Sequence, residues 1–86
     1  MTIQDALNEE IKVLNYDLKD EIELKEILKR RLTKKEWKYF LLKMEGINVE
    51  DTCAKLDLDK ERYDKIVIAV YKKLNSEKIK QELVIK

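Results

Sequence analysis

The sequence predicts a small all-α domain. It has 86 residues with a single glycine and no proline, and a chain with so few helix breakers favours helices joined by short turns. Hydrophobic residues make up 44% of the chain, which is typical of a folded globular domain. Charged residues make up 43% and nearly cancel to a net charge of +1. The composition therefore predicts charged helices around one modest core.

Residues 1–31 are expected to form an N-terminal helical arm. Thr2 and Asp5 resemble a capping box at the start of a helix. Apolar residues then recur at steps of three and four, as on one face of a helix: Ile3, Leu7, Ile11, Leu14, Leu18 and Ile22. The pattern predicts one long helix over 2–31, or two nearly collinear helices with a break at Asn15-Tyr16-Asp17.

Residues 32–75 are expected to form the second unit, which starts with a helix over 33–45. Thr33 and Glu36 have the spacing of a capping box. Gly46 is expected to end this helix, because glycine adopts the left-handed conformation after a helix at little cost.

The remaining helices are predicted from their N-cap residues. They are expected near 49–56, 59–74 and 77–84, after Asn48, Asp59 and Ser76, and the last lies in a short C-terminal segment, 76–86. Apolar positions on these faces predict the central core: Trp37, Phe40, Leu56, Val67, Val70 and Leu74.

The composition disfavours several classes of function. The chain has no histidine and only one cysteine, Cys53, so it offers no zinc-ligand spacing, no internal disulfide and no histidine for acid–base catalysis. The longest apolar run, 66–71, is too short to cross a bilayer. The acidic residues 1–10 do not resemble a signal peptide. We therefore expect a cytoplasmic protein that is not an enzyme, with no cofactor and no membrane partner.

Residues 32–75 also contain a set of residues with a family-like spacing: Leu32-Thr33, Glu36, Leu42, Glu45-Gly46, Glu50 or Asp51, Leu56, Leu58, Tyr71 and Lys73-Leu74. With this set, about half of the chain resembles the LuxR-type helix-turn-helix family without a gap, and more distantly region 4 of sigma factors. The resemblance implies that the helix from Asp59 to Leu74 enters a major groove of double-stranded DNA. It also implies that the helix after Asn75 mediates dimerisation.

The expected DNA contacts lie in the last third of the chain, where residues 59–86 carry a net charge of +3. Residues 1–31 carry −2 and residues 32–58 are balanced. The family's base-reading positions correspond to Asp64, Lys65 and Ile68, and the family favours a basic residue at the first of them. The candidate contacts are Lys60, Arg62 and Lys65, with Lys72 and Lys73 as contacts to the DNA backbone.

A second hypothesis is a helical adaptor or dimerisation module that keeps the fold without reading bases. Ile66 and Ile68 give the helix over 59–74 a second apolar side, which either the N-terminal stripe or a partner must cover. The partner would be a second copy of the chain or another helical protein. The candidate interface residues are Ile66, Ile68, Leu7, Ile11, Leu14 and Leu18.

Overall fold

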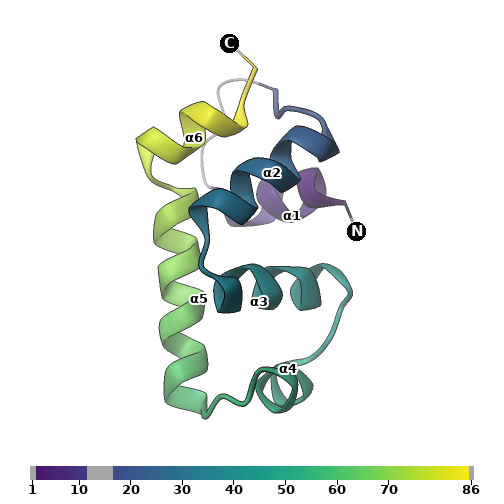
Figure 1. Ribbon diagram of the computed structural model, residues 1–86, viewed down its shortest axis with the longest axis vertical. Coiled ribbons are helices and arrows are strands. Elements are labelled where there is room, and N and C mark those ends of the chain that lie inside the picture. The colour runs from purple at the N-terminus through teal and green to yellow at the C-terminus, as the bar shows by residue number, and fades with distance from the viewer. Residues whose placement is uncertain (1, 12–16, 86) are drawn as a thin grey trace.

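The computed structural model describes residues 2–11 and 17–85. Its described residues form six helices and no strand (Figure 1): α1 (Ile3–Glu10), α2 (Glu21–Arg31), α3 (Lys34–Met44), α4 (Val49–Leu56), α5 (Lys60–Leu74) and α6 (Glu77–Leu83). The predicted all-α class is therefore confirmed.

Helices α3, α4 and α5 begin at the predicted N-cap residues. The Thr33 hydroxyl accepts from the Glu36 amide, and the Glu36 carboxylate accepts from the Thr33 amide at 2.9 Å, which completes the capping box. Asn48 and Asp59 each accept the amide three residues later, both at 2.8 Å. The end of α3 also follows the prediction, because Gly46 adopts a left-handed φ of 78°.

Both forms of the predicted N-terminal arm, one long helix or two nearly collinear helices, are wrong, because the chain doubles back between α1 and α2. Of the predicted break, Asn15 and Tyr16 lie outside the described residues. The Glu21 carboxylate accepts the amides of Ile3 and Gln4 at 2.7 and 3.1 Å, and so caps the first turn of α1. One continuous helix would hold Ile3 and Glu21 about 27 Å apart. Asp20 caps α2 through the amide of Glu23, and the two helix starts therefore lie side by side.

This reversal changes which face of the N-terminal segment is buried. Ile3, Leu7 and Ile11 of the predicted stripe are buried, but Ile22 is 73% exposed. After the break, α2 starts a new helical phase and buries another set: Leu24, Ile27, Leu28 and Leu32.

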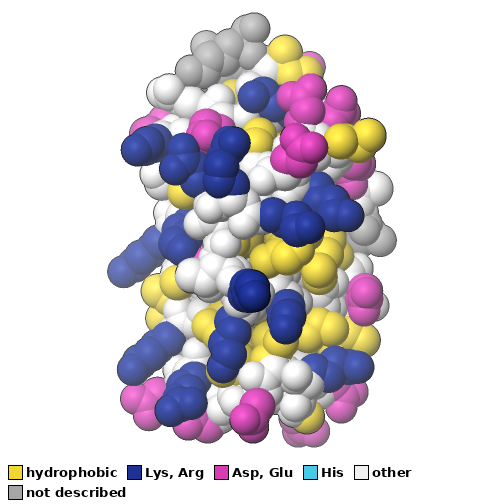
Figure 2. All heavy atoms as spheres, viewed as in Figure 1, with side chains coloured by type: hydrophobic (Ala, Val, Ile, Leu, Met, Phe, Trp, Pro, Cys, Tyr) yellow, Lys and Arg dark blue, Asp and Glu magenta, His cyan; other side chains and the backbone are white. Residues whose placement is uncertain are grey.

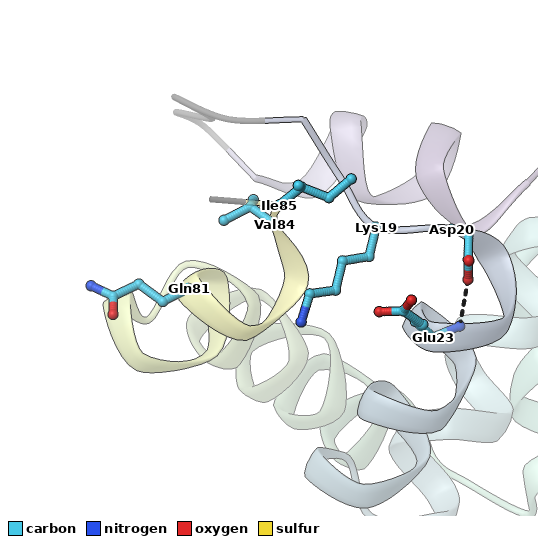
Figure 3. A pocket seen from close by; sticks show the side chains of 6 residues that line it. All are labelled: Lys19, Asp20, Glu23, Gln81, Val84 and Ile85. Carbon is cyan, nitrogen blue, oxygen red and sulfur yellow. Dashed lines mark hydrogen bonds between the residues drawn. The ribbon is translucent and has the colours of Figure 1, made fainter.

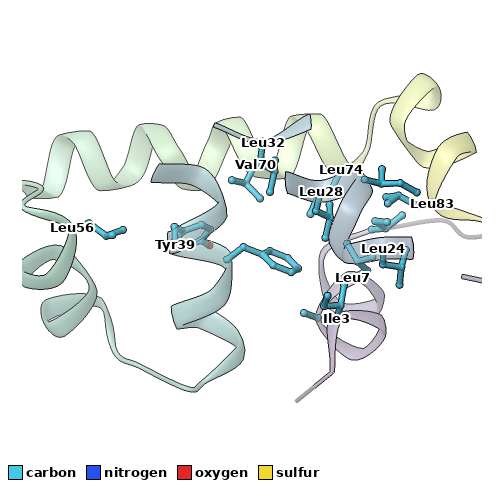
Figure 4. Close-up of a cluster of buried hydrophobic side chains, with 14 residues drawn as sticks. Ile3, Leu7, Leu24, Leu28, Leu32, Tyr39, Leu56, Val70, Leu74 and Leu83 are labelled. Atoms are coloured by element: carbon cyan, nitrogen blue, oxygen red, sulfur yellow. The ribbon is translucent and has the colours of Figure 1, made fainter. Parts of the chain in front are cut away.

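All six helices contribute to the core or pack on it (Figure 4). Four of the six predicted core residues are buried, namely Phe40, Leu56, Val70 and Leu74, whereas Trp37 and Val67 are partly buried against them. The N-terminal residues join the same cluster through Leu7 and Leu24, which are fully buried. The apolar side of α1 is therefore covered within the chain.

Polar contacts also tie the two ends of the chain to the central helices. Glu10 forms an ion pair with Lys43 of α3, and its backbone carbonyl accepts a hydrogen bond from the side-chain Nδ2 of Asn75 at the end of α5. An isolated antiparallel bridge joins Leu18 to Val84. As a result, α1, α2 and α6 lie together toward one end of an elongated molecule. Helix α5 runs along the long axis of the molecule, and α3 runs across that axis (Figure 1).

Candidate nucleic-acid interface

Helix α3 packs against both α4 and α5, and only residues 57–59 separate α4 from α5. The rings of Tyr39 on α3 and Tyr63 on α5 meet edge to face, 5.7 Å apart. Val70 and Leu74 turn one side of α5 into the core. The opposite side of α5 is exposed, and it carries Glu61, Asp64, Lys65, Ile68 and Lys72.

The predicted bases in the first turns of α5 are paired with acids of the same helix. Lys60 Nζ lies 3.0 Å from Asp64 Oδ1, and Lys65 Nζ lies 3.8 Å from Glu61 Oε1. The hydrogen bond to Asp64 raises the pKa of the Lys60 ammonium. Residues 49–65 hold six acids and four bases, so the α4–α5 end of the molecule carries a net charge of −2.

Arg62 and Lys72 are placed differently from these paired lysines. Both side chains are exposed, and neither forms an ion pair within the described part of the chain. Arg62, Lys65, Ile68 and Lys72 follow one another at steps of three or four, so they lie toward one side of the helix. The exposed Glu61 and Asp64 lie among these bases, so the predicted group does not form an uninterrupted basic surface.

Lys73 does not take the expected place on the DNA-facing side. Its ammonium lies 2.6 Å from Glu36 Oε1, the same oxygen that accepts the Thr33 amide. The Glu36 side chain is only 8% exposed. This internal ion pair holds Lys73 against α3, so the ammonium would have to leave Glu36 before it could contact the DNA backbone. The partners are 37 residues apart, and no local pattern indicates such a pairing.

Among the predicted interface residues that the structure describes, only Ile68 is exposed. Leu7 and Ile11 were wrong as interface residues, because they are 0% and 4% exposed and belong to the core. Leu18 and Ile66 are partly buried against that core. Ile68 is 53% exposed. Leu14 lies outside the described residues.

A run of basic residues spans the end of α2 and the start of α3. It is not among the predicted DNA contacts. Residues 29–38 contain six bases: Lys29, Arg30, Arg31, Lys34, Lys35 and Lys38. Their only acid is the buried Glu36. The run is visible in the sequence, but net charges taken over residues 1–31 and 32–58 assign half of its bases to each segment.

The bases of this run differ in how they are held. Arg30 and Arg31 pair with Glu82 of α6 at 3.2 and 2.7 Å. Lys29, Lys34, Lys35 and Lys38 are exposed, and none of these four forms an ion pair with another described residue. Figure 2 shows Lys and Arg side chains over α2 and α3 and along α5, while acidic side chains gather mainly at the upper right and along the lower rim.

The residues that line the hollow in Figure 3 are not a set typical of a catalytic site. The hollow in Figure 3, of about 560 Å³, is lined by residues of the α2 start and the α6 end: Lys19, Asp20, Glu23, Gln81, Val84 and Ile85. Asp20 already serves there as the N-cap of α2. In the described ranges, no group of three His, Cys, Asp or Glu side chains could hold a metal ion.

No family model, curated protein or solved structure matches the chain. The resemblance to the LuxR-type family therefore rests on the residues of 32–75 alone. As for membranes, the described helices are each too short or too polar to cross a bilayer.

Proposed function

We propose that the protein is a small DNA-binding protein or transcription regulator, in which α3, α4 and α5 act as a helix-turn-helix unit. Three features support this proposal: α3 packs on both other helices, a three-residue turn joins α4 to α5, and one side of α5 is exposed. A unit of this kind presents its last helix to the major groove. The exposed bases of α5 are Lys60, Arg62, Lys65 and Lys72.

The observation that carries the proposal is the concentration of exposed bases over α2, α3 and α5 (Figure 2). DNA carries a dense row of phosphates, and each phosphate that a Lys or Arg neutralises releases condensed counterions. Such a surface therefore favours a polyanion even though the whole chain has a net charge of only +1. In this proposal the helix-turn-helix unit provides a helix that fits the major groove, and the exposed bases provide most of the affinity for DNA.

The test is a titration of the full chain with a mixed-sequence duplex of about 20 base pairs at several salt concentrations. We expect binding that weakens as salt rises, with a negative slope of log K on log salt. Absence of binding at low salt would contradict the proposal. Binding that does not depend on salt would also contradict it, because phosphate contacts would then be missing.

The adaptor function has one observation in its favour, the exposed Ile68 among charged neighbours on α5. A large apolar side chain in that position suits a protein contact. Ile68→Asp should abolish that contact by placing a charge in an apolar interface. Light scattering of the wild type and this variant at several hundred micromolar tests it, with Ile22→Asp as a control at another exposed isoleucine. Monomer mass for the wild type would exclude self-association through this face.

A further inference from the structure

Three lysines in the first turns of α3 are exposed to solvent and form no ion pair with another described residue. Lys34, Lys35 and Lys38 are all exposed. The one acid of these turns, Glu36, is buried and paired with Lys73 of α5. Its charge is therefore neutralised on the inner side of the helix, and the outer side keeps its positive charge. Lys29 of the last turn of α2 is also exposed, and only a short connection separates α2 from α3.

We infer that Lys29, Lys34, Lys35 and Lys38 form a surface, the α2–α3 basic surface, that binds the sugar-phosphate backbone of a nucleic acid. This inference rests on the proposed DNA-binding function and deepens it. It moves the main electrostatic contact from the first turns of α5, which the family resemblance implies, to α3.

The spacing of the lysines suits a row of phosphates. Lys34 and Lys38 are four residues apart, which places them on one side of α3 with an axial separation of about 6 Å. Each strand of a duplex carries one charge per about 3.4 Å of helix axis. Two flexible lysines at this separation therefore reach phosphates of the same strand, and Lys35 adds a third contact beside them.

Lys60 and Lys65 of α5 must each lose an ion-pair partner before they bind a phosphate, whereas Lys34, Lys35 and Lys38 of α3 form no ion pair among the described residues. Lys60 and Lys65 each have a carboxylate one turn away within 4 Å. Phosphate must compete with that carboxylate, and the acid itself repels the DNA. On α3, Lys34, Lys35 and Lys38 have no carboxylate of a described residue within the 4 Å of an ion pair.

The surface fits a nucleic acid better than a membrane or an acidic protein. The large hydrophobic side chains exposed in the described residues are Ile22, Val49, Ile68 and Ile85, and none of them lies on α3. A helix that binds in the plane of a membrane needs such side chains to insert among the lipids. Lysine is also depleted at protein–protein interfaces, whereas exposed lysines are the ordinary ligands of phosphate rows.

The experiment compares two full-length variants with the same loss of charge. One carries Lys34→Gln, Lys35→Gln and Lys38→Gln, and the other carries Lys60→Gln, Arg62→Gln and Lys65→Gln. Glutamine keeps a good helix propensity, and circular dichroism with thermal unfolding confirms that both variants are folded. Each is titrated with the 20-base-pair duplex over a range of salt, beside the wild type, and with polyglutamate and vesicles of anionic lipid.

We expect the α3 variant to reduce the salt slope by about two to three, at about 0.9 per lost phosphate contact, and to weaken binding at low salt at least tenfold. The α5 variant should reduce the slope by less than about one. A larger loss in the α5 variant would overturn the inference and leave the proposed function standing. Wild-type binding to polyglutamate or to vesicles as tight as to the duplex would overturn the assignment to nucleic acid. No wild-type binding to the duplex would overturn the proposed function itself.

Discussion

The first turns of α3 and of α5 start alike and end with opposite electrostatic character. Each helix begins at a side-chain cap, Thr33 or Asp59, and each carries three exposed bases in its first two turns. On α5, exposed acids alternate with the bases and pair with two of them. On α3, the one acid is buried. The comparison indicates that the burial or exposure of the acidic side chains, rather than the number of bases, decides which helix surface attracts an anion.

The cause of this difference is the third residue of each helix. In α3 that residue is Glu36, which folds back to the Thr33 amide and meets Lys73 from α5. In α5 the third residue is Arg62, so Asp59 caps the helix without an acidic partner. The acids of α5 then occupy exposed positions at which they face its own lysines.

Phe40→Ala should have the largest effect, because Phe40 supports the helices that carry both surfaces. Its side chain is 0% exposed and stacks against Trp37 with ring centroids 6.1 Å apart. We expect a loss of about 3–5 kcal/mol in the free energy of unfolding, measured by urea denaturation. Ile22→Ala, at a 73% exposed position, should change it by only about 0.5 kcal/mol. Similar losses in the two variants would show that the core is assigned incorrectly.

Alkaline pH should lower the free energy of unfolding, because Tyr39 is buried where α3 packs on α5. Burial, with a smaller contribution from Tyr63, raises the pKa of the Tyr39 phenol to about 12, above its ordinary value of about 10. Between these values the unfolded chain loses the proton and the folded chain keeps it, so stability is full below pH 10 and falls as pH rises. The expected loss is about 2–3 kcal/mol.

Urea denaturation between pH 9 and pH 12 measures this loss. Tyr39→Phe is the control, since it removes the titrating group and retains the ring. If the variant and the wild type lose stability equally over this range, Tyr39 does not titrate as described.

Lys73→Met should destabilise the fold by about 1–3 kcal/mol, because it leaves the buried Glu36 carboxylate without its ion-pair partner. Lys72→Met is the matched control at the adjacent, exposed position, where about 0.5 kcal/mol or less is expected. Thermal and urea unfolding of the pair measure the difference. Equal stability of the two variants would mean that Glu36 is solvated, and its charge would then weaken the α2–α3 basic surface.

Asp64→Lys should have the smallest effect, and it makes α5 resemble α3 more closely. It removes the partner of Lys60 and adds a base at an exposed position. Duplex binding should strengthen, with a salt slope larger by about one. Asp17→Lys makes the same change of charge at an exposed residue near the opposite end of the chain, and it should leave the slope nearly unchanged. An equal gain from both variants would reflect net charge alone.

Much of the fold could be predicted because its signals are local. Thr33, Asn48 and Asp59 cap their helices through residues three positions away, and such spacing is visible in a sequence. The reversal at the N-terminus could not be predicted in this way. It depends on Glu21 meeting the first turn of α1, eighteen residues earlier, and the apolar period continued across the break to Ile22.

The candidate interface was predicted less well than the fold. The exposure of Lys60, Arg62, Lys65 and Ile68 follows from helical periodicity. The burial of Leu7 and Ile11 and the pairing of Lys73 depend on contacts between distant helices. The α2–α3 basic surface was readable in part, since residues 29–38 hold six bases and one acid. The burial of Glu36, which unmasks that surface, follows only from the packing of α5 on α3.

The assignment of the main DNA contact to the α2–α3 basic surface is tested by mapping amide chemical shifts while a short duplex is added to the isotope-labelled chain at low salt. We expect the largest chemical-shift changes within residues 29–38 and smaller changes at Lys72 and on the exposed side of α5. Changes confined to residues 59–68, with 29–38 unaffected, would contradict this assignment and return the main contact to the first turns of α5.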